Sequence, residues 1–535
     1  MSIRDKIRHL VHHRQKSIFS ATVVLAITFL LSAILGFLRT RFLYSVFFKC
    51  CVLDLDAYNA AFRIPDLIFK LLVTGALSAS FIPVFSSYLH KNKKHAQLMA
   101  SSVINLLLLF FVGISVIALI FAHPLSQLIA KGFSPYQIDL MSNLTRVLLV
   151  AQIFFLISNF LTAILQVNQI FIVSALSPII YNLFIILSIY TLAPVFGIFG
   201  VAYGAVIGAF FHMAIQIPSI RHLGFKYSPI ASFSIPGVRE IVRLMIPRTL
   251  SLGLAEIEST VTLFFASTLA AGSISLLNLA LQLMYLPSRV FGTTVGQASL
   301  PILSKNIAKN QLNQFRNTVR KTILQSIYIA FPIGVLILVN RLPIVRLTFG
   351  TKQFPWSATL LTARTLAFLT PAIVCQAVIQ ILIRSFYALH DTKTPLKISA
   401  ISLFFNVITS YFFVHFTSMG IVGLAISASI GNLIQCIGLF WLFILRVDGD
   451  GWREMLFSFN RIFISSILCG LVSWLTIRSL DLFILDTTKT VNVLLVFGTS
   501  ILTGIISFLV FTWLFHSPEF TYIKSYLSRF FRFLS

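Results

Sequence analysis

Long apolar stretches alternate with short polar connections along almost the whole chain. About fourteen stretches are long enough to cross a bilayer as helices, which takes roughly 20 residues each. They lie at 18–38, 58–88, 98–122, 139–165, 171–193, 196–218, 248–270, 273–303, 318–340, 357–388, 395–416, 420–445, 459–480 and 490–515. This pattern predicts an all-α polytopic membrane protein with about 14 transmembrane helices.

The composition agrees with a membrane protein. Of the 535 residues, 57% are hydrophobic and only 10% are charged, whereas a soluble domain has about a quarter of its residues charged. A net charge of +26 is also typical of nucleic-acid binding, but the lysines and arginines gather in alternate connections. That distribution is the topology signal of a cytoplasmic (inner) membrane protein, and an even number of helices with both termini cytoplasmic satisfies it. We therefore expect no nucleic-acid partner.

Two basic segments have the pattern of helices that lie on a membrane surface, at 236–247 and 519–534. A solvated connector explains the first segment equally well. The five cysteines include the adjacent pair Cys50 and Cys51, a poor frame for a disulfide, so we expect no bridge.

The chain repeats itself. The Ala-Ser-Phe-Ile-Pro sequence that ends at Pro83 is echoed by Ala-Ser-Leu-Pro ending at Pro301, and the Gly-Ile-Phe-Gly sequence at Gly197 by Gly-Ile-Val-Gly at Gly420. The two echoes have nearly the same offset, which indicates a duplication with six helices in each copy and parallel orientation. This predicts two six-helix lobes around a central cationic cavity, plus two C-terminal helices. The expected domains are 1–235, 236–446 and 447–535.

The second apolar stretch is unusual because it carries two cations and three helix breakers. Arg63 and Lys70 are seven residues apart and share a helix face, and Pro65, Gly75 and Pro83 interrupt the stretch. Cations at membrane depth normally face a polar cavity or an anionic ligand. We predict that Arg63 and Lys70 attract a diphosphate into a cavity, and that the three breakers act as hinges.

Other charges lie in or near the apolar stretches. Arg39 ends the first helix and Arg289 lies within the eighth, and each either faces the cavity or extends to the membrane surface. Glu256 and Glu258 in the seventh helix point about 200° apart, so both cannot line one cavity. One of them is a candidate site for a coupling cation or proton, or it pairs with an arginine.

Catalytic motifs are missing from the sequence. No Walker loop, GxGxxG, HExxH or GxSxG pattern occurs, the chain has only 15 acidic residues, and no cysteine spacing suits a metal. We therefore expect a transporter rather than an enzyme, with no cofactor and no metal.

Several short motifs resemble those of one family. They are Gly36-Phe37-Leu38-Arg39, Asp56-Ala57, Ala61-Phe62-Arg63-Ile64-Pro65-Asp66-Leu67, Gly75-Ala76-Leu77-Ser78, Phe81-Ile82-Pro83, Leu300-Pro301 with Ser304, and Phe386-Tyr387-Ala388 with Asp391-Thr392-Lys393-Thr394-Pro395. Together they resemble the MurJ/MviN family of lipid II flippases in the MOP exporter superfamily. The resemblance runs through both halves and implies fourteen helices in two lobes around a V-shaped cationic cavity.

The family's cavity residues carry over in part. Arg39 matches the arginine after the first-helix Gly-Phe, and Asp56 matches the acid before the second helix. The chain departs from the family at Ala33, Thr40, Phe69, Thr74 and the Leu281-Gln282 pair. Lys70 beside Phe69 keeps a cation, and Arg289 lies two turns, about 10 Å, from Gln282 on the same face. The expected substrate-binding residues are therefore Arg39, Asp56, Arg63, Lys70, Gln282 and Arg289, in a divergent member.

The resemblance implies a flippase that moves the undecaprenyl-diphosphate-linked precursor of peptidoglycan (lipid II) from the inner to the outer leaflet by alternating access. Membrane potential or a monovalent cation would reset it, and the implied partners are lipid II, membrane lipids, and proteins of division and peptidoglycan synthesis. Three alternatives stay open. They are a MOP flippase for another polyprenyl-linked oligosaccharide, a cation-coupled antiporter, which the excess of basic residues disfavours, and a membrane scaffold that transports nothing.

Overall fold

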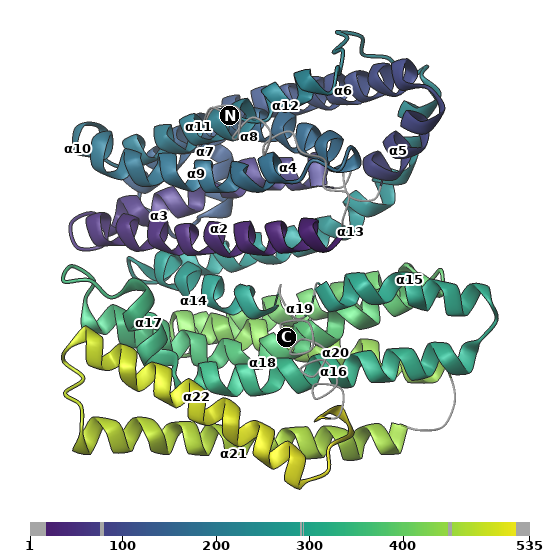
Figure 1. Ribbon diagram of the computed structural model, residues 1–535. Helices are drawn as coiled ribbons and strands as arrows, with labels where there is room; N and C mark the ends of the chain where they lie inside the picture. The colour runs from purple at the N-terminus through teal and green to yellow at the C-terminus, as the bar shows by residue number, and fades with distance from the viewer. Residues whose placement is uncertain (1–17, 75–79, 289–291, 293, 448–451, 521–535) are drawn as a thin grey trace, which may run out of the picture. The chain divides into compact units, whose positions relative to one another are not determined.

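The computed structural model describes residues 18–74, 80–288, 292, 294–447 and 452–520 (Figure 1). Within these ranges the regular structure is helical throughout and contains no strand. The chain divides into two compact units, Met1–Ile274 with Thr351–Phe354, and Ser275–Gly350 with Pro355–Ser535. The predicted all-α class is confirmed.

The first unit is built around one long helix. This helix, α8 (Pro135–Val167), packs against α3, α4, α5, α6, α7 and α11, and buried phenylalanines such as Phe81, Phe111 and Phe160 fill its surroundings. The unit's other helices are α2 (Ile18–Phe47), α3 (Val52–Ala61), α4 (Arg63–Phe69), the π-helical turn η1 (Lys70–Thr74), α5 (Ile82–Lys91), α6 (Lys93–Ile120), α7 (Ala122–Ile129), α9 (Ile172–Thr191), α10 (Ala193–Phe196), α11 (Ile198–Ala214), α12 (Ile217–His222) and α13 (Pro236–Ser267).

The second unit has the same plan. Its long helix, α18 (Trp356–Ala388), packs against α15, α16, α17 and α20, while α21 and α22 pair with each other and contact α16. The remaining elements are α14 (Ser273–Ser288), α15 (Thr294–Ala308), α16 (Leu312–Val339), α17 (Arg341–Phe349), α19 (Lys393–Phe416), α20 (Ile421–Arg446), α21 (Trp452–Phe483) and α22 (Thr490–Leu514).

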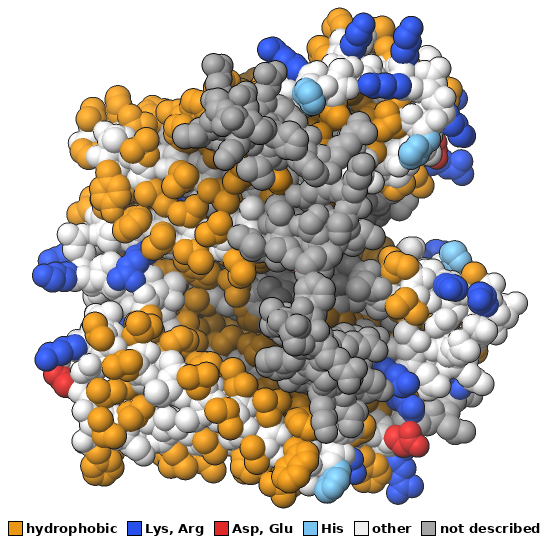
Figure 2. All heavy atoms as spheres, in the orientation of Figure 1, with side chains coloured by type: hydrophobic (Ala, Val, Ile, Leu, Met, Phe, Trp, Pro, Cys, Tyr) orange, Lys and Arg blue, Asp and Glu red, His pale blue; other side chains and the backbone are white. Residues whose placement is uncertain are grey.

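Eleven helices in the described part of the chain are long and apolar enough to cross a membrane. Hydrophobic side chains cover much of the visible helix surface in Figure 2, which suits contact with lipid. All eleven overlap predicted stretches, and the first, Thr28–Phe47, extends beyond the predicted end at residue 38. The three predicted stretches outside this set correspond to the broken series α3–α4–η1–α5, to α13 and to α14 with α15. The exact count of fourteen is therefore not confirmed.

Local geometry supports the internal repeat. Helices α6 and α16 both have 28 residues, and α8 and α18 both have 33. Gly197 precedes α11 with φ 56° and ψ −138°, and Gly420 precedes α20 with φ 55° and ψ −131°. Two glycines in the same rare conformation before matching helices are what a duplication would leave. The predicted domain boundaries themselves stay a prediction, and α13 clusters with the first unit.

The structure differs from two smaller predictions, the separate surface helix at 236–247 and the absence of a disulfide. Residues 236–247 are not a separate segment but the first part of α13, where Val238 and Ile241 join the core of the first unit. The expectation of no disulfide is wrong for one pair, because the turn after α2 brings the side chains of Cys50 and Cys51 together as a disulfide. The segment 519–534 lies almost entirely outside the described residues.

The connection between α12 and α13 lies along α6 and is held there by hydrogen bonds. Asn105 donates to the carbonyls of Ser228 (2.8 Å) and Ile230 (2.9 Å), and Ser102 exchanges hydrogen bonds with the backbone of Ser232. Gln97 donates to the carbonyl of Gly224 at 2.8 Å. A polar stripe on α6 thus fixes the chain that leads into α13.

Candidate functional site

The second predicted membrane helix is broken into short pieces. Helix α3 ends at Ala61 and α4 begins at Arg63, with Phe62 between them still near helical angles (φ −68°, ψ −19°), and after Phe69 the chain changes to the π-helical turn η1. Pro65 lies in the first turn of α4, where its missing N–H costs no helical hydrogen bond. Pro83 lies in the first turn of α5, and Gly75 lies outside the described residues. The hinge role of these three residues stays a prediction.

A neighbouring helix satisfies backbone groups at the break. The Thr249 hydroxyl of α13 donates to the carbonyl of Leu71 in η1 at 3.0 Å. Irregular backbone at membrane depth needs such partners in protein or water. Helix α13 therefore braces the part of the chain that carries the two predicted cations.

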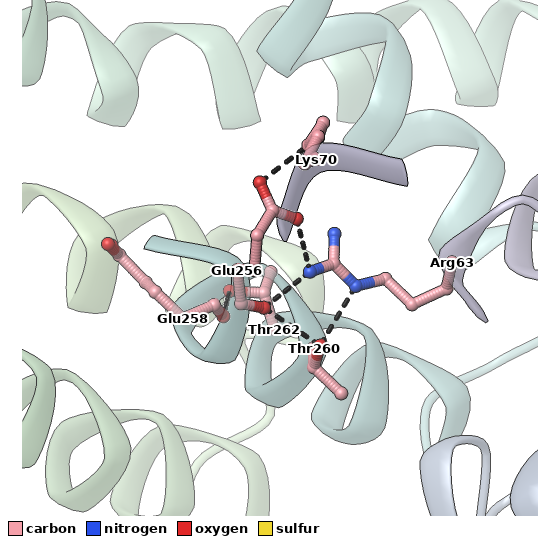
Figure 3. A network of polar contacts seen from close by, with 6 residues as sticks. All are labelled: Arg63, Lys70, Glu256, Glu258, Thr260 and Thr262. Atoms are coloured by element: carbon pink, nitrogen blue, oxygen red, sulfur yellow. Dashed lines mark hydrogen bonds and ion pairs between the residues drawn. The ribbon is translucent and has the colours of Figure 1, made fainter. Parts of the chain in front are cut away.

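Glu256 of α13 binds both of those cations (Figure 3). Its Oε2 lies 2.7 Å from Nη2 of Arg63, and its Oε1 lies 3.1 Å from Nζ of Lys70. The Arg63 guanidinium also donates to the Glu256 carbonyl and, through Nε, to Oγ1 of Thr260 at 2.8 Å. The helix-face argument that placed Arg63 and Lys70 together is thus confirmed by a shared carboxylate.

Burial differs among the three charged side chains. Arg63 is 10% exposed and Glu256 is 11% exposed, while Lys70 keeps 42% of its side chain exposed. Removing a charge from water is costly unless a well-placed opposite charge compensates, and here the carboxylate does so. The cluster thus has a buried part, the Arg63–Glu256 pair, and an accessible part at Lys70.

The two glutamates of α13 have different surroundings. Figure 3 shows the Glu258 carboxylate pointing away from Arg63 and Lys70, on the other side of the helix. Thr262 donates to the backbone carbonyl of Glu258 at 3.0 Å. Of the two interpretations of Glu256, the structure shows the ion pair. The candidate cation site at Glu256 or Glu258 stays a prediction.

The remaining candidate residues lie elsewhere. Arg39 in α2 places its guanidinium carbon 5.8 Å from the ring centroid of Tyr181. Asp56 is buried in α3, where its Oδ2 accepts a hydrogen bond from the N–H of Gly272 at 2.6 Å, in the turn after α13. Gln282 is half-buried in α14 of the second unit. Arg289 lies outside the described residues.

Sequence reasoning missed three polar members of the site. Thr249 and Thr260 are common residue types, and nothing in the sequence pattern distinguishes them, although Thr260 follows Glu256 by one helical turn. Asp66 did carry a signal, because it lies one turn from both Arg63 and Lys70 on the same helix face. Its Oδ1 accepts a hydrogen bond from Nε2 of Gln152 in α8 at 2.8 Å.

Eleven candidate spans in the described part of the chain define a multi-pass membrane protein, and an ion cluster on a broken membrane helix is typical of a transporter. The fold is similar to that of a lipid II flippase MurJ in an inward closed conformation, with a TM-score of 0.75, 24% identity, and coverage of 92% of this chain and 99% of that one. It is also similar to an inward-facing MATE family multidrug resistance transporter of the MOP superfamily, with a TM-score of 0.66, 16% identity, and coverage of 80% and 98%.

The sequence narrows this class to one family. The family model described as lipid II flippase MurJ matches residues 45–494, so the chain belongs to the MurJ family. Relatives include a probable lipid II flippase MurJ of Bdellovibrio bacteriovorus, which is 26% identical over 92% of this chain and 94% of its own length. The lipid II flippase MurJ of Burkholderia cenocepacia is 24% identical, with coverage of 79% and 84%.

Proposed function

We propose that this chain flips lipid II from the inner to the outer leaflet of the cytoplasmic membrane by alternating access. The observation that carries the proposal is the match to the MurJ family over residues 45–494. The paired cations on the broken helix support it independently, because the headgroup of lipid II is joined to its lipid through a diphosphate.

Arg63 and Lys70 supply the chemistry that this substrate needs. A guanidinium and an ammonium bind phosphate oxygens through charge-assisted hydrogen bonds, and low-dielectric surroundings strengthen them. Arg39 would add a contact to the headgroup, while the polyprenyl tail stays in the bilayer, and the substrate-binding roles of Gln282 and Arg289 stay predictions. Bending at the breaks beside Phe62 and η1 would let the wall that carries these cations move.

The remaining expectations belong to the same proposal. The protein acts without chemical conversion of its substrate, and membrane potential or a monovalent cation resets it. Both termini face the cytoplasm, as the positive-inside rule requires. Membrane lipids and proteins of division and peptidoglycan synthesis are its further partners.

Complementation tests the proposal. The wild-type gene should restore growth of bacteria depleted of their own lipid II flippase, and Arg63→Ala and Arg39→Ala should each fail while reaching normal membrane levels. Arg221→Ala is the matched control, because Arg221 is an exposed residue of α12. If Arg39→Ala restores growth as well as the wild type, Arg39 has no role in substrate binding.

Reconstitution separates the alternatives. Proteoliposomes containing the purified chain should move fluorescent lipid II between leaflets and leave a polyprenyl diphosphate with a different oligosaccharide in place. Transport of the other oligosaccharide alone would assign the chain a different substrate. Transport of neither lipid would overturn the proposed function.

A further inference from the structure

Glu256 lies where an anionic headgroup would have to meet Arg63 and Lys70. One carboxylate bridges the two cations, with one oxygen on each (Figure 3). Carboxylate and phosphate oxygens accept hydrogen bonds from the same donors, so Glu256 and a phosphate compete for one site. In this structure the Glu256 carboxylate occupies the position at Arg63 and Lys70 that a phosphate would take.

Building on the proposed function, we infer that Glu256 is a displaceable counter-ion that sets the affinity for the headgroup. A diphosphate binds Arg63 and Lys70 by taking the place of the Glu256 carboxylate. The displaced carboxylate belongs to α13, whereas both cations belong to α4 and η1. Headgroup binding therefore breaks a link between two helices, and the energy of the lost ion pairs reduces the net affinity.

The exposures of the side chains give the order of the exchange. Lys70 is 42% exposed and its pair with Glu256 is the longer one at 3.1 Å, so an incoming anion meets Lys70 first. Partly exposed ion pairs contribute little and break readily. Within the described part of the chain, Nη1 of Arg63 has no hydrogen-bond partner, which leaves the two N–H groups of this nitrogen available before Glu256 departs.

Displacement would loosen α13 along its middle. Among the described residues, four pairs linked by a side-chain hydrogen bond or ion pair join α13 to α4 and η1, namely Arg63–Glu256, Lys70–Glu256, Arg63–Thr260 and Thr249–Leu71. Three of these polar pairs involve the two cations, so an anion that captures Arg63 and Lys70 leaves the Thr249 hydroxyl as the remaining polar link, beside apolar packing such as that of Leu71 on Gly253. The exchange thus couples substrate binding to the freedom of one helix, and the coupling is reciprocal.

Binding to two charge-neutral variants tests the competition. We would measure the affinity of inorganic pyrophosphate and of lipid II for the full chain in nanodiscs, using wild type, Glu256→Gln and Glu240→Gln. Glu256→Gln should bind both probes about tenfold more tightly, because the competing charge is gone. Glu240→Gln removes the same charge from an exposed position near the start of the same helix, and its affinity for both probes should stay within about twofold of wild type.

Each outcome of the binding experiment decides one question. Equal affinity of Glu256→Gln and wild type for both probes overturns the inference, even if wild type flips lipid II. Tighter pyrophosphate binding by Glu256→Gln, combined with no lipid II binding by any variant, keeps the anion exchange and overturns the proposed substrate.

A second measurement needs no substitution at Glu256, so a folding defect of that variant cannot hide the answer. Cysteines placed at Leu71 and Thr249, in a chain without its five native cysteines, should be joined by a short thiol-specific cross-linker, because the Thr249 hydroxyl lies 3.0 Å from the Leu71 carbonyl. Saturating lipid II should lower the cross-linking yield by about half, as α13 is released. An unchanged yield while lipid II is bound would overturn the coupling to helix movement.

Discussion

At the scale of single residues, two buried charges in the described part of the chain each have a partner that is distant in the sequence. Arg63 meets Glu256, and buried Asp56 accepts the N–H of Gly272. Such partners are required because an unpaired buried charge or polar group costs a large fraction of a protein's stability. The cost also explains why both pairs join elements that are far apart in the sequence.

Asp56 provides the first prediction. Asp56→Ala leaves the N–H of Gly272 without its acceptor at a site where Asp56 is 2% exposed, and should lower the free energy of unfolding by about 1–3 kcal/mol. Asp56→Asn keeps an acceptor oxygen, so its free energy of unfolding should fall by less than that of Asp56→Ala. Thermal unfolding of the purified protein in detergent measures both changes.

The control for Asp56 is its neighbour on the same helix. Asp54 accepts a hydrogen bond from the Tyr136 hydroxyl at an exposed site, where water can replace the lost partner. Asp54→Ala should therefore lower the free energy of unfolding by less than Asp56→Ala does. If Asp56→Asn is as stable as wild type but fails in complementation, Asp56 acts in transport as the sequence predicted, beyond its contact with the turn.

Sequence reasoning reached Arg63 and Lys70 but not their arrangement. Their spacing and the apolar stretch around them identify a shared polar face, because a charge at membrane depth is costly and normally faces the protein interior or a polar cavity. Glu256 lies 193 positions from Arg63, and helical periodicity carries no information about contacts over such separations. Two interpretations of Glu256 were therefore equal at the level of sequence, and only the fold distinguishes them.

At the scale of elements, short polar motifs decide where helices begin. Asp391, in the connection between α18 and α19, accepts hydrogen bonds from the N–H groups of Lys393 and Thr394 and from the Thr394 hydroxyl. These N–H groups have no partner within the helix, so the carboxylate caps α19. The Asp-Thr-Lys-Thr-Pro motif thus has a structural role in addition to its family resemblance.

The cap makes a pH dependence predictable. Slight burial opposes ionisation of Asp391, but the N–H and hydroxyl of Thr394, nearby Arg446 and the N–H of Lys393 outweigh it, so the pKa of this carboxyl is below its usual value. A lowered pKa means that the stabilisation is complete above about pH 4 and is lost as the pH falls through the folded-state pKa. The difference in melting temperature between wild type and Asp391→Ala should therefore shrink between pH 7 and pH 3. A constant difference would show that the capping charge contributes nothing.

The matching glycines of the repeat give a paired prediction. Gly197 and Gly420 have positive φ, and a Cβ added at either would meet no atom within 4 Å. Alanine at either position should lower the free energy of unfolding by about 1–3 kcal/mol through backbone strain alone, and the two losses should be similar. Chemical denaturation measures the two losses.

Gly113 in α6 is the control for the paired glycines. It also has open space around its added Cβ, but its φ is not positive. Alanine at Gly113 should therefore be neutral or stabilising by up to about 1 kcal/mol. Unequal losses at Gly197 and Gly420 would argue against equivalent roles in a repeat.

At the scale of the whole molecule, hydropathy predicted the long helices well and the helices of the candidate site poorly. The helices α6, α8, α9, α16, α18 and α22 are 20 residues long or longer, each contains a strongly apolar segment, and all agree with the predicted stretches. The second and eighth predicted stretches are divided among several helices, and α13 carries Arg239, Glu240, Arg243, Glu256 and Glu258. Polar residues lower the mean hydropathy and helix breaks shorten the continuous helix, and these are the two features by which a membrane span is identified. The π-helical turn of η1 leaves no trace in hydropathy.

Membrane topology gives the last prediction. In a variant without native cysteines, a cysteine at Lys94, before the main apolar part of α6, should react with a membrane-impermeant reagent only from the cytoplasmic side. A cysteine at Ala271, in the exposed turn after α13, should react only from the outside. Labelling of intact cells and of inverted vesicles measures this. Reaction of both from one side would show that the number of crossings between them is even.

The polar stripe on α6 has a consequence for how α13 can move. Gln97, Ser102 and Asn105 fix the backbone between residues 224 and 232, so the connection that precedes α13 is anchored on α6. A displacement of Glu256 therefore requires α13 to bend along its length, with its N-terminal end held in place, rather than to shift as a rigid body.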